Sequence, residues 1–277
     1  MSARPIGVRW TIGDVSDDGW EALRLAVWGG WSVFGPGARY AVCVNTIPLA
    51  EARRRAGDFP SAVRWVEATG SLPPAIRGHV GENMAEGKAW KFDPLHVFPD
   101  CWELSFDNDC ILWEMPDTIR AWLAAGDRER CLIAADVRAC HGAFSHLTDG
   151  EPRNAGIRGL PPRFPLERLM AEILDETPVV MTSELDEQGL QVAAVSRLKP
   201  LAVVSVEEVT ICSPFWPHLP HLGRFGAHFV GLNEHDLPWD YYGRPAIECV
   251  REHWRRHRDE VHARVGFPQP SMQTEAV

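Results

Sequence analysis

Residues 98–113, FPDCWELSFDNDCILW, decide the fold of this chain, because three polar residues interrupt a run that otherwise has the composition of buried strands. The two apolar stretches are residues 103–106 and 110–113, and the residues between them are Asp107, Asn108 and Asp109. An isolated buried carboxylate costs several kcal/mol unless a cation neutralises it. Mg²⁺ or Mn²⁺ with oxygen ligands satisfies two carboxylates together. A polar turn between two strands is the alternative interpretation.

Upstream of this stretch, strands and helices alternate. Residues 6–12, 39–45 and 63–67 have strand character. Ser16, followed by two aspartates, marks the start of a helix, and an Arg-rich helix is predicted at residues 48–56. Strands separated by single helices need crossover connections, so this order predicts a parallel, doubly wound sheet.

Downstream, the spacing of apolar residues predicts further helices and strands up to a closing helix. The predicted helices are residues 117–126, 166–174, 184–198 and 245–266, and the predicted strands are residues 131–135 and 201–211. Segments rich in Gly, Pro and His are expected to be long functional loops, at residues 70–87, 141–164 and 213–243. We therefore expect a single α/β domain over residues 1–267, with a mostly parallel central sheet flanked by helices, and a flexible tail at 268–277.

Composition disfavours nucleic-acid-binding, disulfide-rich and membrane-spanning proteins. The 277 residues carry a net charge of −10, so no overall positive field gathers nucleic acid, and we expect no nucleic-acid partner. The seven cysteines form no CxxC pair, which favours reduced thiols over a disulfide framework or a structural zinc site. We find neither a signal-peptide pattern nor an apolar run approaching the roughly 20 residues of a membrane span. These features predict a cytoplasmic protein without a transmembrane segment.

Four stretches resemble one superfamily, in order. The sequence FPDCWELSFDNDCIL resembles the DxD region of GT-A fold glycosyltransferases, which use nucleotide-diphosphate sugars and a divalent metal. Residues 154–159, NAGIRG, are similar to the segment that lines the donor sugar, and residues 184–190, ELDEQGL, look like the acidic helix start near the transferred sugar. HFVGLN at 228–233, followed by Pro238 and Trp239, is similar to the HxxGxxKPW pattern of one branch.

The resemblance implies a fold, a cofactor and a site. It implies a single Rossmann-like GT-A domain, with a nucleotide-binding half at about residues 6–113 and a sugar and acceptor half at about 114–267. The implied ligands of Mn²⁺ or Mg²⁺ are Asp107, Asp109 and His228. The expected nucleotide and donor contacts are Thr11, Asn45, Lys91, Asp107, Asn108, Asn154 and Gly156. The expected catalytic residues are Asp186, Glu187 and Gln188.

The implied reaction transfers a sugar from a nucleotide-diphosphate donor, with UDP favoured, to an unidentified acceptor. The metal stabilises the charge that develops on the leaving diphosphate. A carboxylate at position 186 or 187 would take the acceptor proton in an inverting enzyme, or support the oxocarbenium-like sugar in a retaining one. The alternative for both is that they favour the first turn of a helix.

The chain departs from the HxxGxxKPW branch at one position that matters. Glu234, His235 and Asp236 occupy the region where that branch carries a phosphate-binding lysine. Lys88 or Lys91, just before the predicted DxD strand, would replace that cation, and a solvated surface lysine is the alternative.

Two other functions remain open from the sequence. A haloacid-dehalogenase-type phosphotransferase would use Asp107 as nucleophile and Asp109 as acid/base, but its motif normally follows the first strand, and a late Asp-Asp pair is missing. A non-catalytic nucleotide-sugar or glycan-binding domain is the second alternative. The histidine pairs His218/His221 and His253/His257 have metal-ligand spacing but lack a third ligand in sequence, which favours incidental pairs.

Overall fold

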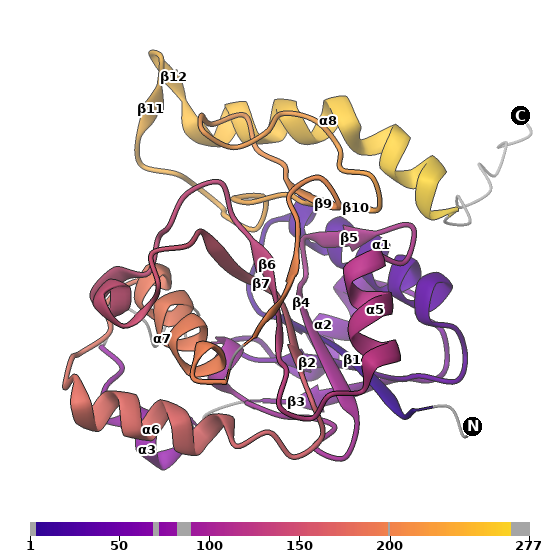
Figure 1. Ribbon diagram of the computed structural model, residues 1–277. Coiled ribbons are helices and arrows are strands. Elements are labelled where there is room, and N and C mark those ends of the chain that lie inside the picture. Colours follow the sequence, from indigo (N-terminus) through magenta and orange to yellow (C-terminus); the bar gives the residue numbers. More distant parts are fainter. Residues whose placement is uncertain (1–3, 69–71, 82–89, 199, 267–277) are drawn as a thin grey trace, which may run out of the picture.

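The computed structural model describes residues 4–68, 72–81, 90–198 and 200–266. A seven-stranded sheet forms its centre, with strand order β3-β2-β1-β4-β7-β6-β8 (Figure 1). Neighbouring strands are parallel except that β7 runs antiparallel to both β4 and β6. Their bounds are β1 Ile6–Ile12, β2 Arg39–Val44, β3 Val63–Glu67, β4 Trp102–Asp107, β6 Leu132–Ala135, β7 Arg153–Leu160 and β8 Ala202–Val204. The predicted α/β fold with a mostly parallel sheet is confirmed.

Helices cover both faces of the sheet, and side-chain alternation along the strands supplies a core to each face. On β6, Leu132 and Ala134 join one core with α1, α2, α5 and α8, whereas Ile133 joins the other with α3, α6 and α7. The helices are α1 Asp17–Phe34, α2 Leu49–Ala56, α3 Pro74–Arg77, α5 Asp117–Ala125, α6 Leu166–Glu176, α7 Glu184–Ser196 and α8 Ala246–Val265. Two 3₁₀ segments are η1 Trp90–Phe92 and η2 Gly142–Leu147.

A second, three-stranded sheet lies between the main sheet and α8, in the order β5-β10-β9 (Figure 1). Its strands are β5 Cys110–Leu112, β10 Gly226–His228 and β9 Val209–Ile211, and a two-stranded ribbon follows at β11 Asp240–Tyr241 and β12 Arg244–Pro245. Since β4 ends at Asp107 and β5 begins at Cys110, the Asp-Asn-Asp segment is the junction between the two sheets. The two apolar stretches therefore belong to different sheets.

Three predictions about the second half of the chain are wrong. The predicted strand at 201–211 is two strands, β8 and β9, which belong to different sheets. The predicted loop at 141–164 contains η2 and β7, an inner strand of the main sheet, and the predicted loop at 213–243 contains β10 and β11. Strand β7, RNAGIRGL, was not predicted because its glycine, asparagine and alanine residues have low strand propensity, although its interior is buried.

Other predictions lie partly outside the described residues. The tail at 268–277 lies outside them, as do residues 70–71 and 82–87 of the predicted loop at 70–87; residues 72–81 of that loop are described and contain α3. All seven cysteines are free thiols. In the described part of the chain, every helix is too short or too polar to cross a membrane.

The packing of α1 against β5 generates a stability prediction. Gly29 lies on α1 directly over the backbone carbonyl of Leu112, and a Cβ at this position would overlap that oxygen. The Leu112 carbonyl belongs to the backbone and cannot move aside as a flexible side chain can. Gly29→Ala should therefore lower the free energy of unfolding by about 1–3 kcal/mol, despite the better helix propensity of alanine. Urea denaturation measures this change.

Gly37→Ala is the matched control, because a Cβ at Gly37 meets open space. Its free energy of unfolding should stay within about 0.5 kcal/mol of the wild type. Equal stability of Gly29→Ala and the wild type would contradict the close approach of α1 and β5.

Candidate active site

A cleft of about 440 Å³ opens where β4 ends. Open α/β sheets bind ligands at the carboxyl ends of their strands, so this is the position expected for a functional site. The cleft is lined by residues from both predicted halves of the chain. The predicted site residues among them are Thr11, Lys91, Asp107, Asn108, Asp109, Asn154, Glu187, Gln188 and His228.

Asp107, Asp109 and His228 converge at the centre of this cleft. Nε2 of His228 lies 3.4 Å from Oδ2 of Asp107 and 3.3 Å from Oδ1 of Asp109. The three side chains present ligand atoms within 4.8 Å of one another. The second sheet explains this approach, because His228 on β10 pairs in register with Cys110, the residue after Asp109. Residues far apart in sequence thus form one potential metal site.

Gly156 makes room for the His228 imidazole. A Cβ at Gly156 would overlap both Cε1 and Nδ1 of that ring. Asn154 Oδ1 accepts a hydrogen bond of 2.7 Å from the Gly156 N–H, and Asn154 Nδ2 donates to Asp136 at 2.9 Å. Gly156 therefore lies beneath the cleft and leaves space for the His228 ring, whereas Asn154 lines the cleft itself.

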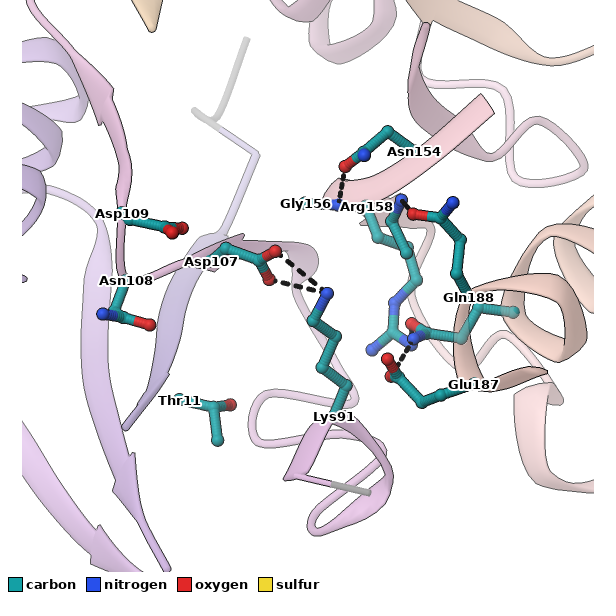
Figure 2. A network of polar contacts seen from close by, with 12 residues as sticks. Thr11, Lys91, Asp107, Asn108, Asp109, Asn154, Gly156, Arg158, Glu187 and Gln188 are labelled. Carbon is teal, nitrogen blue, oxygen red and sulfur yellow. Dashed lines mark hydrogen bonds and ion pairs between the residues drawn. The ribbon is translucent and has the colours of Figure 1, made fainter. Parts of the chain in front are cut away.

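Lys91 supplies a positive charge to the site. Its ammonium lies 2.9 Å from the Asp107 carboxylate, and Figure 2 shows its side chain extending between Asp107 and Glu187. Of the two lysines that the sequence offered for phosphate contact, Lys88 lies outside the described residues. Burial opposes the charge of Lys91, but the carboxylate of Asp107 outweighs burial and raises the pKa of Lys91 above its usual range.

A pair of asparagines holds the junction between the sheets. Asn233 donates from Nδ2 to Asp109 Oδ2 at 3.0 Å and to Asn108 Oδ1 at 3.1 Å. Asn108 donates in turn to the carbonyl of Gly19 at 3.4 Å. Asn108 thus supports the turn, and Asn233 orients the Asp109 carboxylate. Sequence reasoning missed Asn233, although it ends the HFVGLN stretch that carries His228.

Glu187 and Gln188 face the cleft from the first turns of α7. Gln188 accepts from the Ala155 N–H at 3.2 Å and donates to the Cys140 carbonyl at 3.0 Å, so its amide is fixed in orientation. Glu187 accepts a hydrogen bond from Gln191. Burial, reinforced by the nearby Asp107 carboxylate and opposed by Lys91, raises the pKa of Glu187 to about 7.

A buried arginine behind Glu187 was also missed by sequence reasoning. Arg158 on β7 is 1% exposed and donates to the Gln191 side chain and, at 3.2 Å, to the Leu95 carbonyl. Gln191 therefore links the Arg158 guanidinium to the Glu187 carboxylate. A signal was present in NAGIRG, since an arginine between apolar strand residues needs a buried partner.

Three predicted site residues do not line the cleft: Gly156, which lies beneath it, and Asp186 and Asn45. Asp186 accepts from the Thr182, Ser183 and Ala143 backbone N–H groups, and with Ser183 it forms the capping box of α7. This is the structural alternative that the acidic helix start left open. Asn45 follows β2, and its backbone N–H bonds the Ile12 carbonyl at 3.0 Å. Neither side chain borders the cleft as the structure describes it.

Positive charge already compensates the two aspartates. Burial disfavours protonated His228, but Asp109 and Asp107 outweigh burial and raise the pKa of His228 to about 10. Burial likewise disfavours ionised Asp107, but Lys91 and His228 hold its pKa well below the usual range. The site thus joins two carboxylates to an imidazole whose proton a metal ion can replace. This donor set fits Mn²⁺ or Mg²⁺.

Comparisons with known proteins place the fold. No protein-family model matches the chain, and no curated protein matches its sequence. Among solved structures, galactosyltransferase LgtC in complex with donor and acceptor sugar analogues has a TM-score of 0.52 and 14% identity, over 96% of this chain and 98% of that one. An active-site glutamine-to-glutamate mutant of LgtC gives a TM-score of 0.50 and 15% identity, over 90% and 95%.

Mouse xyloside xylosyltransferase 1, in its apo form, has a TM-score of 0.54 and 9% identity, over 83% of this chain and 99% of that one. At such identities the likeness concerns the fold. The chain therefore has the GT-A fold of glycosyltransferases, with an Asp-x-Asp pair at the carboxyl end of β4.

Proposed function

We propose that this protein is a metal-dependent glycosyltransferase that transfers a sugar from a nucleotide-diphosphate donor, a UDP-sugar, to an acceptor hydroxyl. The observation that carries the proposal is the convergence of Asp107, Asp109 and His228 in the cleft of a GT-A fold. Two carboxylates and an imidazole leave coordination positions open for diphosphate oxygens. The three solved structures compared above are glycosyltransferases, which supports the same reaction class.

In the proposed reaction, this chain binds and orients the donor. Asp107, Asp109 and His228 would hold Mn²⁺ or Mg²⁺, which when bound stabilises the negative charge of the leaving diphosphate. Lys91 lies beside Asp107 and would contact the diphosphate, in place of the lysine absent from residues 234–236. Thr11 and Asn154 line the same cleft and would contact the nucleotide and the sugar.

Glu187 and Gln188 would act at the transferred sugar. Both line the cleft, and Gln188 keeps one amide N–H beyond its bond to Cys140, so it can donate to the donor or the acceptor. Glu187 has a pKa of about 7, near the value that suits proton transfer at neutral pH. Asp186 would hold the start of α7 in place, and we assign it no substrate contact.

The GT-A fold does not support the haloacid-dehalogenase alternative, whose motif follows the first strand, because here the Asp-x-Asp pair follows β4. A binding domain without turnover remains the competing function. Incubation with Mn²⁺ and a panel of UDP-sugars distinguishes the two, because a transferase slowly releases UDP by transfer to water. Bound UDP-sugar without any UDP release would favour the binding domain.

Removing one metal ligand should weaken metal-dependent UDP binding. We predict that UDP binds the wild type only with Mn²⁺ present, and that Asp109→Ala weakens this binding by about tenfold or more. Titration calorimetry with and without Mn²⁺ measures both effects. Asp14→Ala is the matched control: this carboxylate also lines the cleft but lies outside the metal-ligand cluster. UDP binding that ignores Mn²⁺ would refute the proposed metal dependence.

Metal binding should release a proton from His228. In the metal-free protein the pKa of His228 is raised to about 10, so the ring is protonated at pH 7, whereas a metal ligand must be neutral. Mn²⁺ affinity should therefore rise about tenfold per pH unit from pH 7 towards pH 10. Calorimetry in buffers of different ionisation enthalpy counts the released protons.

The expected count is about one proton per Mn²⁺ at pH 7 for the wild type, and none for His228→Gln. Protonated His228 also makes the stability of the folded protein without metal depend on pH. The contribution of protonated His228 is fully present below its ordinary pKa of 6.5 and is lost as the pH rises through about 10. A wild type that binds Mn²⁺ without releasing a proton would contradict a protonated His228 that becomes a metal ligand.

A further inference from the structure

A second group of potential metal ligands lies outside the cleft, between the three-stranded sheet and α8. Cys212 directly follows β9, and His253 and His257 lie one turn apart on one face of α8. Their ligand atoms lie within 4.8 Å of one another. The sequence showed no third ligand near this histidine pair. In the fold, Cys212, which precedes His253 by 41 residues, provides it.

The distances fit one small ion. Cys212 Sγ lies 3.2 Å from His253 Nε2. In a tetrahedral zinc site, sulfur and nitrogen ligands lie about 3.6 Å apart, as follows from bonds of about 2.3 and 2.0–2.1 Å. A shift of a few tenths of an ångström therefore places an ion between these two atoms.

The third ligand is held in the orientation typical of metal-binding histidines. His257 Nε2 lies 3.0 Å from the Pro220 carbonyl oxygen. Because a carbonyl only accepts, His257 must donate from Nε2, which leaves Nδ1 with a free lone pair. Such a bond from the second ring nitrogen to a backbone carbonyl fixes the tautomer and raises ligand basicity.

The surroundings favour a soft ion. Cys212 and His253 are 1% and 3% exposed, and the Phe229 ring lies with its centre 6.4 Å from both histidine rings. His253 Nδ1 is buried without a hydrogen-bond partner among the described residues, so the hydrogen bond of this ring is the one between Nε2 and the Cys212 sulfur. Thiolate with two imidazoles selects Zn²⁺ over Mg²⁺ or Mn²⁺, which prefer oxygen-rich sites.

We propose that Cys212, His253 and His257 form a zinc site that ties α8 to β9, with water in the fourth position. His257 is partly exposed, which leaves that position open to solvent. The Cys212 thiol proton leaves to solvent when the thiolate binds the ion. The Cys212 N–H also donates to the His228 carbonyl at 2.8 Å. The ion would therefore brace the strand that delivers His228 to the cleft, through a site independent of the cleft carboxylates.

Cobalt spectroscopy tests the proposal on the whole chain after treatment with a chelator. One equivalent of Co²⁺ should produce a thiolate-to-cobalt charge-transfer band in the near ultraviolet and the intense visible bands of a tetrahedral site, and Zn²⁺ should remove both. Co²⁺ bound in the cleft gives no thiolate band, because its ligands there are oxygen and nitrogen. Asp109→Ala should therefore keep the band, whatever the outcome for the proposed function.

Three variants decide which residues bind the ion. Cys212→Ser should lose the thiolate band, and His257→Gln, at a partly exposed position, should weaken Co²⁺ binding by about tenfold or more while the chain stays folded. Cys249→Ser is the matched control, since Cys249 is also buried and lies on α8 outside the cluster. A wild type without a thiolate band, a band that survives in Cys212→Ser, or unchanged affinity in His257→Gln would overturn the proposal.

Discussion

The structure depends on keeping two carboxylates, Asp107 and Asp109, in a mostly buried position at the junction of two sheets. Without nearby positive charge this arrangement would be too costly. Lys91 from η1 and His228 from β10 supply that charge in the metal-free protein. A divalent cation would substitute for the proton of His228, and the same geometry would then attract a diphosphate rather than repel it. On the proposed function, a chain of net charge −10 would hold an anionic donor in this way.

The small sheet is what brings the C-terminal third of the chain to this junction. The chain leaves the main sheet after Asp107 and enters the second sheet at Cys110, where β10 pairs antiparallel with β5 and places His228 opposite Cys110. Asn233 then returns to Asp109, and Gly156 on β7 leaves space for the imidazole. Parts of the chain separated by more than 100 residues thus build one site because strand register fixes their approach.

Much of this could be predicted from the sequence wherever the signal is local. The helix start at Ser16, the apolar strands and the Asp-x-Asp segment each show in a short window. Strand β7 does not, because its Gly, Asn and Ala residues have low strand propensity and because buried Arg158 needs a distant partner, Gln191. For the same reason Asn233 was missed. Asp186 shows the limit of a local pattern: an acidic residue at a helix start matched a catalytic expectation, and in the structure its oxygens cap backbone N–H groups.

The central claim is that the carboxylates and His228 hold a metal that holds the donor diphosphate. A crystal structure of the protein with Mn²⁺ and UDP, with anomalous data to locate manganese, tests it most directly. The account predicts one manganese ion coordinated by Asp107, Asp109 and His228 and by oxygens of the UDP diphosphate, with Lys91 beside the phosphates. Manganese elsewhere, or UDP bound in the cleft without a metal, would contradict it.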